Sequence, residues 1–107
     1  MIIQRSEPFE IDLQHQFRWY LLETELDPAP ALELAQQIAD CVEETLEFLG
    51  ESPSVGRRRL SSFSNLTGLR SWKLQKPFER FLIFYRVEND VLNVVRLLDG
   101  HRRLAAD

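Results

Sequence analysis

The sequence contains little cysteine and no long apolar run. Cys41 is the only cysteine among 107 residues, which excludes an intramolecular disulfide and is typical of proteins in a reducing cytosol. The strongest apolar run, residues 91–98, is interrupted by Asn93 and Arg96. It does not approach the ~18 apolar residues that a membrane helix needs. The first ten residues carry charged side chains where a signal peptide would be apolar. We therefore expect a cytoplasmic protein without membrane contact.

Residues and motifs that hold metals or nucleotides are also scarce. The two histidines, His15 and His101, share no metal-ligand spacing with Cys41. The sequence has no G-x-S-x-G motif, no P-loop and no dinucleotide-binding glycine pattern. We therefore expect neither a metal nor a cofactor.

The length and composition indicate one globular domain that spans residues 1–107. A chain of 107 residues can form one hydrophobic core but not two. Hydrophobic residues make up 44% and charged residues 28% of the chain, close to the average of soluble proteins. Disorder and collagen-like structure are therefore excluded.

The net charge of −4 conceals an uneven distribution. Residues 1–54 hold twelve acidic and two basic residues, a net charge of −10, whereas residues 55–107 hold eleven basic and five acidic residues, a net charge of +6. This difference predicts a polarised surface. Either the first half merely forms Glu-rich helices, or the basic half binds an acidic protein or a nucleic acid.

The first half predicts a strand and two helices. Residues 2–5 begin with the apolar pair Ile2-Ile3, and we expect them to form the short strand. Ser6 can cap a helix over residues 8–26, whose apolar face is widened by Trp19 and Leu22. Asp27 can cap a second helix, which ends where Gly50 follows it. The short connection between them predicts an antiparallel helical hairpin.

The second half predicts a loop and three strands. Residues 51–69 have loop composition, with one short ordered piece around residues 60–63. The expected strands cover residues 69–74, 80–87 and 91–98, with a link over 75–79 and a tight turn at 88–90. Helices and strands are segregated, so the fold class is α+β in the order β-α-α-β-β-β. We expect an antiparallel meander with the helices on its apolar face and the first strand at an edge.

Three sequence pieces, in order, carry a family resemblance. They are Gly68-Leu69-Arg70, the strand Leu82-Ile83-Phe84-Tyr85-Arg86, and Val94-Val95-Arg96-Leu97-Leu98 followed by Asp99-Gly100. This arrangement resembles the RelE/ParE superfamily of type II toxin–antitoxin toxins, and within it the ParE branch. Asp12-Leu13 also matches the usual Asp-Leu of its first helix. The chain departs from the family where Asp99 replaces the histidine at the end of the last strand, and in a longer link before Arg80.

The resemblance implies a toxin that binds DNA gyrase and blocks replication without being an enzyme. A cognate antitoxin would neutralise it by burying an amphipathic helix or an added strand on it. The alternative is a RelE-like endonuclease that cuts messenger RNA on the ribosome, in which cations stabilise the developing phosphate charge and a group titrating near pH 7 moves protons. A third reading is a non-toxic interaction module with the same fold.

The candidate binding residues are basic and lie in or after the predicted strands. For the target or antitoxin surface they are Arg70, Lys73, Arg86, Arg96, His101, Arg102 and Arg103; the endonuclease would use Arg70, Arg86, Arg96 and His101. A guanidinium suits phosphate or carboxylate, but each arginine could instead pair with a nearby acid, and His101 could be a solvated tail residue. Arg57-Arg58-Arg59 is either a phosphate clamp or a solvated run. We expect either a homodimer or a hetero-oligomer with the antitoxin.

Overall fold

The computed structural model describes residues 1–59 and 68–100 of the chain. Its elements follow the predicted order, with two additions, a 3-10 turn and a short strand. They are β1 (Ile2–Arg5), α1 (Glu7–Leu22), α2 (Pro28–Glu51), the 3-10 turn η1 (Pro53–Val55), β2 (Arg57–Arg58), β3 (Arg70–Lys73), β4 (Phe81–Glu88) and β5 (Val91–Asp99). The α+β class and the segregated order are confirmed. The strand β2 lies in a segment for which a loop was predicted, and the expected ordered piece at 60–63 falls outside the described residues.

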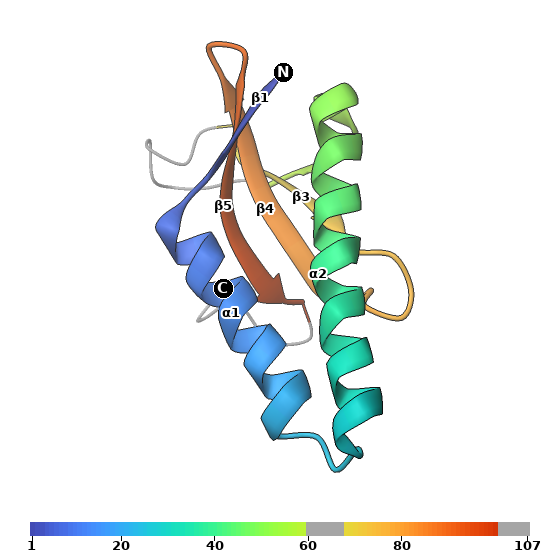
Figure 1. Ribbon diagram of the computed structural model, residues 1–107. Helices are drawn as coiled ribbons and strands as arrows, with labels where there is room; N and C mark the ends of the chain where they lie inside the picture. The colour runs from blue at the N-terminus through green and yellow to red at the C-terminus, as the bar shows by residue number, and fades with distance from the viewer. Residues whose placement is uncertain (60–67, 101–107) are drawn as a thin grey trace.

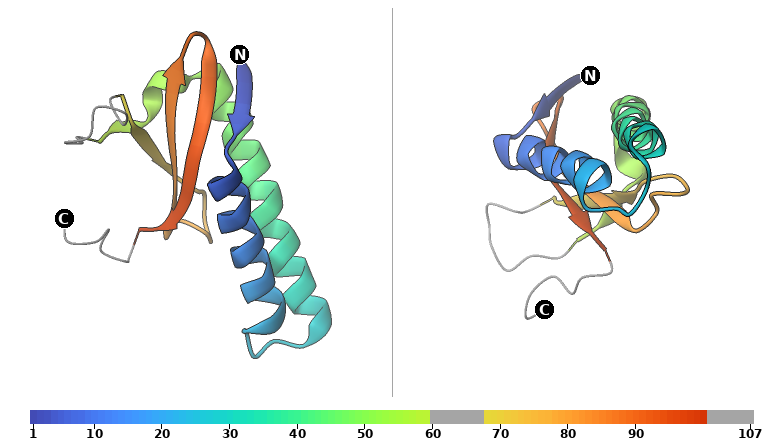
Figure 2. Two further views of the ribbon diagram at one scale, coloured as in Figure 1. Left: turned by 90° about the vertical axis from the view of Figure 1, so that its left-hand side faces the viewer. Right: turned by 60° about the horizontal axis from the view of Figure 1, so that its bottom comes forward.

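The strands form one mixed sheet in the order β1-β5-β4-β3-β2. β3, β4 and β5 are the expected antiparallel meander, and β1 adds to the edge of β5 in parallel. Both helices lie on the same face of this sheet (Figures 1 and 2). We call this the covered face and the opposite one the open face. In the described part of the chain, no helix is long and apolar enough to span a membrane.

The covered face holds the core. Alternate residues of a strand point to the same face, and on this face Ile83 of β4 lies opposite Leu97 of β5 and Tyr85 opposite Val94, all four buried. The buried residues of the helices that join them in one cluster are Phe9, Tyr20, Ala35, Ile38, Val42, Leu46 and Leu49. The hairpin between β4 and β5 turns at Asn89 and Asp90, whose φ angles of 53° and 61° are those of a two-residue hairpin turn.

The helix boundaries differ from the predicted ones for local reasons. Ser6 caps α1 as expected, because its hydroxyl accepts a hydrogen bond from the Phe9 N–H. The helix ends at Leu22 rather than at residue 26; the Thr24 hydroxyl donates to the Tyr20 carbonyl, a local bond that competes with further helix.

The second helix also departs from prediction at both ends. Asp27 stands at the N-cap position, but its side chain makes no capping hydrogen bond. Gly50 lies inside α2, not after it, because the helix continues to Glu51. It stops at Ser52, whose backbone leaves the helical region (φ −137°, ψ 64°) because Pro53 follows it.

Candidate functional site

On the open face, opposite the two helices, the strand register orders the side chains in rows. One row crosses β1, β5 and β4 as Gln4, Asn93 and Arg86. A second row crosses β3, β4 and β5 as Ser71, Phe84 and Arg96, and a third as Lys73, Leu82 and Leu98. Between the first and second rows, Val95 interrupts the pairing as a bulge.

The first row lines a hollow of about 460 Å³ together with Ser6 and Val95. Arg86 is half-buried, with its Nη2 atom 3.6 Å from Glu88. The side chains of Gln4 and Asn93 both donate and accept hydrogen bonds. Because a guanidinium can make two parallel bonds to a carboxylate or phosphate, this row can hold an acidic group or a segment of extended backbone.

The side chain of Arg70, on β3, contacts the segment that follows α2. Its Nη1 group donates to the Gly56 carbonyl at 2.8 Å and to the Ser54 carbonyl at 3.1 Å. The Tyr85 hydroxyl donates to the Pro53 carbonyl at 2.7 Å and accepts from the Gly56 N–H at 2.9 Å. These bonds tie the segment after α2 to the sheet. Burial raises the pKa of Tyr85, against the opposing effects of the Gly56 N–H and of Arg70.

Gly56 is required for this arrangement. A Cβ atom at this position would lie 2.2 Å from the Tyr85 hydroxyl oxygen and 2.8 Å from its ring. A side chain therefore cannot enter here unless the buried tyrosine moves.

Arg96 is held by the first helix. Its Nε and Nη2 groups donate to the two carboxylate oxygens of Asp12 at 2.7 and 2.9 Å, and the same carboxylate accepts the Leu97 N–H at 3.0 Å. The hydrogen bond to Asp12 raises the pKa of Arg96, although partial burial opposes it. Asp12 thus joins α1 to β5 beyond Val94, where the pairing with β1 has ended.

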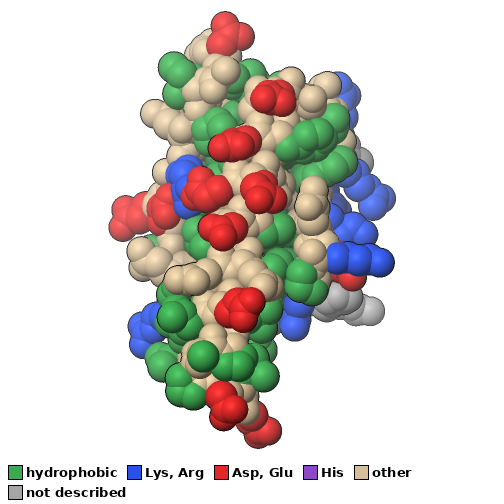
Figure 3. Space-filling model, turned by 45° about the vertical axis from the view of Figure 1, so that its right-hand side comes forward, with side chains coloured by type: hydrophobic (Ala, Val, Ile, Leu, Met, Phe, Trp, Pro, Cys, Tyr) green, Lys and Arg blue, Asp and Glu red, His purple; other side chains and the backbone are tan. Residues whose placement is uncertain are grey.

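Another group of basic residues lies toward the other edge of the sheet. Arg57 and Arg58 form the exposed strand β2, and Lys73 is exposed on β3. Arg59 donates from Nε to the Ser71 hydroxyl at 2.7 Å, with its guanidinium 5.7 Å from the centre of the Phe84 ring. In Figure 3, acidic side chains follow α2, while Lys and Arg gather toward the side where the sheet lies. The charge division of the sequence is therefore visible on this surface.

The structure brings only part of the predicted site together. Arg86 lines the hollow and Lys73 lies two rows away, whereas Arg70 and Arg96 bond to other parts of the fold. His101, Arg102 and Arg103 lie outside the described residues. Sequence reasoning missed Gln4 and Asn93, because a neutral amide gives no charge signal; only the register between the two strands shows that they are neighbours. Among the described residues, no cluster of His, Cys, Asp and Glu could hold a metal ion.

Comparison with known proteins agrees with this architecture. The family model described as "ParE toxin of type II toxin-antitoxin system, parDE" matches residues 3–104. The chain belongs to the ParE toxin family. Among solved structures, one described as the chromosomal ParDE TA system from P. aeruginosa aligns with a TM-score of 0.65 at 21% identity, over 91% of this chain and 92% of that chain. At this identity the likeness shows the fold alone. The search of curated proteins found no match.

The three arginines of the sequence resemblance differ in what their side chains contact. Arg70 and Arg96 maintain the ParE-like fold through bonds to backbone carbonyls and to Asp12. Arg86, from the same sequence pattern, instead lines an open hollow.

Proposed function

We propose that this ParE-family chain acts in the cytoplasm as a toxin that binds DNA gyrase and blocks replication, and that an antitoxin encoded beside it neutralises it. The observation that carries the proposal is the family match over residues 3–104, on a sheet whose open face presents Arg86, Asn93 and Gln4 in one hollow. Gyrase inhibition by binding needs a complementary surface and no catalytic group.

The geometry favours this function over RNA cleavage. An endonuclease of the RelE kind would use Arg70, Arg86 and Arg96 together around one phosphate. In the described structure, Arg70 donates to two backbone carbonyls and Arg96 is bound by Asp12 through two nitrogens. Neither of these two residues lines the hollow that Arg86 lines. A net charge of −4 also gives weak general attraction to RNA phosphates.

The hollow also suits the antitoxin. An extended segment that lies across the hollow could place an acidic side chain against Arg86. The proposed antitoxin contact is thus an acidic extended segment, and its affinity should fall as salt rises.

Expression of the chain, alone and with the protein encoded beside it, tests the proposal when growth, gyrase supercoiling and transcripts are all measured. We expect growth arrest, loss of supercoiling by purified gyrase, intact transcripts, and rescue by the small protein encoded beside it. Arg86→Glu should weaken gyrase inhibition, whereas Lys76→Glu, an equal charge change on the exposed link before β4, should not. Cut transcripts with unaffected gyrase would instead establish the endonuclease, and harmless expression would establish the interaction module.

A further inference from the structure

The edge of the sheet that β2 and β3 form is basic and contains no acidic residue. The two strands, residues 57–58 and 70–73, hold four cations and no carboxylate. Arg70 bonds to backbone carbonyls, whereas Arg57, Arg58 and Lys73 are exposed to solvent. We call these three exposed residues the basic edge.

The cations of the basic edge have no partner in residues 1–59 and 68–100. Within these ranges, no hydrogen bond or ion pair engages the side chain of Arg57, Arg58 or Lys73. The ion pairs of the described chain hold other arginines, namely Arg5, Arg80, Arg86 and Arg96. Like charges on neighbouring strands repel one another, and an anionic partner that spans them would remove this repulsion.

The strand pairing places two of these charges on one face of the sheet. Arg57 pairs with Ser71, which in turn pairs with Phe84 on the open face. Because alternate residues of a strand share a face, Lys73 also lies on the open face. It is a diagonal neighbour of Arg57, about 7–8 Å away, and Arg58 follows on the same edge strand. Charges spread out in this way suit a chain of phosphates better than one small anion.

The surroundings of the basic edge favour a duplex over single-stranded nucleic acid. Proteins bind single strands by stacking the bases on exposed aromatic rings. Phe84, on the open face, is only 5% exposed, and the guanidinium of Arg59 lies 5.7 Å from the centre of its ring. Trp72 packs against Phe48 of α2. Neither ring is offered beside the basic edge, so binding would depend on phosphates, which a duplex presents along both strands.

The same surroundings do not favour a protein as the partner. The centre of a protein interface is apolar and contains aromatic anchors. None of the large exposed hydrophobic residues of the described chain lies on β2 or β3. A highly charged and solvated partner therefore fits this edge better than the surface of an acidic protein.

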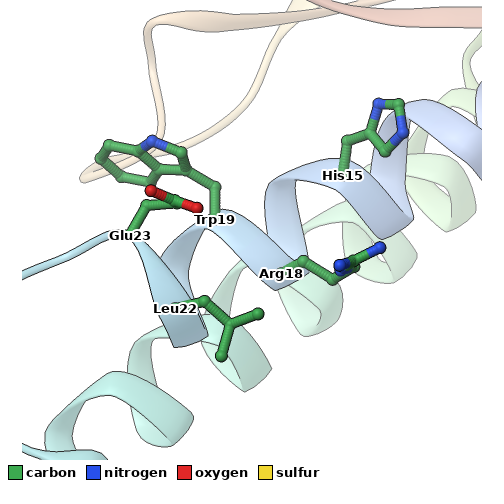
Figure 4. A pocket seen from close by; sticks show the side chains of 5 residues that line it. All are labelled: His15, Arg18, Trp19, Leu22 and Glu23. Carbon is green, nitrogen blue, oxygen red and sulfur yellow. The ribbon is translucent and has the colours of Figure 1, made fainter.

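A hollow on the first helix provides a contrast. It has a volume of about 340 Å³ and is lined by His15, Arg18, Trp19, Leu22 and Glu23 (Figure 4). The Glu23 carboxylate lies beside the Trp19 ring in this view, so a cation and an acid share one surface. Such a mixed surface does not select an anion, whereas the basic edge, without a carboxylate on its strands, does.

We propose that the basic edge binds the phosphate backbone of double-stranded DNA without reading its sequence. Each cation that meets a phosphate releases counterions from the DNA, which supplies the affinity. The net charge of −4 does not prevent this local contact. Acidic side chains follow α2, while Lys and Arg gather toward the sheet (Figure 3), and charges more than about 8 Å apart are largely screened at physiological salt.

The choice of DNA over an RNA duplex rests on the proposed function, because gyrase acts on double-stranded DNA. A toxin bound to gyrase through the hollow around Arg86 could then contact the DNA that gyrase holds. The phosphate contact itself is independent of gyrase, so it can be measured with DNA alone.

Fluorescence anisotropy of the purified full chain with a short labelled DNA duplex tests the proposal, with no gyrase present. Three phosphate contacts predict that the affinity falls about 40-fold between about 50 and 200 mM salt. Arg57→Gln and Lys73→Gln each remove one contact, and the fall should then be only about 12-fold. Duplexes of different sequence should bind equally well.

Arg18→Gln is the matched control, because it makes the same charge change on the exposed side of α1. Its affinity for the duplex should fall about 40-fold over the same salt range, as in the unchanged chain. Circular dichroism of each variant verifies that the fold is retained.

Other results would overturn the proposal. One is a chain that does not bind the duplex at about 50 mM salt. Another is a salt dependence that both variants leave unchanged, as expected if the charges only prevent other strands from pairing with this edge. Tighter binding of a single strand or of an RNA duplex would contradict the choice of DNA. Variants that bind DNA normally but lose the antitoxin would assign the basic edge to a protein.

Discussion

The two faces of the sheet differ in what their residues do. On the covered face, Tyr85 is fully buried and its hydroxyl bonds to the segment after α2. On the open face, Arg86, the very next residue, lines a hollow with Asn93 and Gln4. Both residues belong to the stretch that carries the family resemblance. The difference teaches that two neighbouring residues of one strand can serve different ends: Tyr85 holds the fold, whereas Arg86 borders the hollow to which we assign the target.

The largest loss of stability is expected at Gly56, which lies against the buried Tyr85 side chain. Gly56→Ala places a methyl group 2.2 Å from the Tyr85 hydroxyl, and it should reduce the free energy of unfolding by about 3 kcal/mol. Urea denaturation measures this change. Gly50→Ala is the matched control: the new methyl group would meet only the flexible end of Ile3 at 3.2 Å, and alanine favours the helix. Equal losses in both variants would contradict the close contact at Gly56.

A smaller loss of stability is expected when only the hydroxyl of Tyr85 is removed. Tyr85→Phe leaves the Gly56 N–H and the Pro53 carbonyl without the partner that they have in the structure. Loss of a buried hydrogen-bond partner should reduce the free energy of unfolding by about 2 kcal/mol. Urea denaturation near neutral pH provides the measurement, and an unchanged midpoint would show that water replaces the hydroxyl.

The stability of the Tyr85→Phe variant should also depend on pH differently from that of the unchanged chain. Burial raises the pKa of Tyr85 above its ordinary value of 10.0, so the folded state holds the proton more tightly than the unfolded chain. The contribution to stability is complete below pH 10 and decreases as pH rises from there through the folded-state pKa. Tyr20, whose pKa burial also raises, adds to this loss. The Tyr85→Phe variant should therefore lose less stability above pH 10 than the unchanged chain.

The ion pair between Asp12 of α1 and Arg96 of β5 should contribute less to the free energy of unfolding. Asp12→Asn removes the charge that holds Arg96, and the free energy of unfolding should fall by about 1 kcal/mol, because Arg96 is partly exposed to solvent. Glu88→Gln, which weakens the longer contact with Arg86, is the comparison and should change little. Thermal denaturation of both variants distinguishes them; a greater loss in Glu88→Gln would reverse the roles assigned to the two arginines.

The smallest effect on stability is expected on the open face. Arg86→Ala should change the free energy of unfolding by no more than about 0.5 kcal/mol, as surface substitutions usually do. It should nevertheless reduce growth inhibition and gyrase binding strongly. A large loss of stability would place Arg86 among the residues that hold the fold and remove the contrast between the two faces.

Most of the fold could be predicted from the sequence, because its signals are local. The Ser6 cap and the alternation in residues 80–87 and 91–98 predict their elements directly. The strand β2 could not be predicted in this way, since its two arginines have no apolar pattern and pair only because β3 lies beside them. Trp19 and Leu22 were predicted to widen the inner apolar face of α1, but they are 45% and 67% exposed, because spacing alone does not say where the buried face of a helix ends.

The candidate site was less predictable than the fold. The sequence singles out arginines by their charge, but the separate roles of Arg70, Arg86 and Arg96 depend on partners up to 84 positions away. Asp12 was recognised as part of the resemblance and not as the partner of Arg96. Gln4 and Asn93 carry no distinguishing signal until β1 is paired with β5.

The pairing of β1 with β5 also has a consequence for synthesis. Ser6 bonds to Val95 and Asp12 bonds to Arg96 and Leu97 across separations of 84 to 89 residues. Contacts this distant form late and slow folding, and on the ribosome they cannot form until the segment that contains β5 has emerged. The hollow, which needs Gln4 beside Asn93, is therefore absent from the nascent chain. The surface around this hollow can therefore form only after almost the whole domain has been translated.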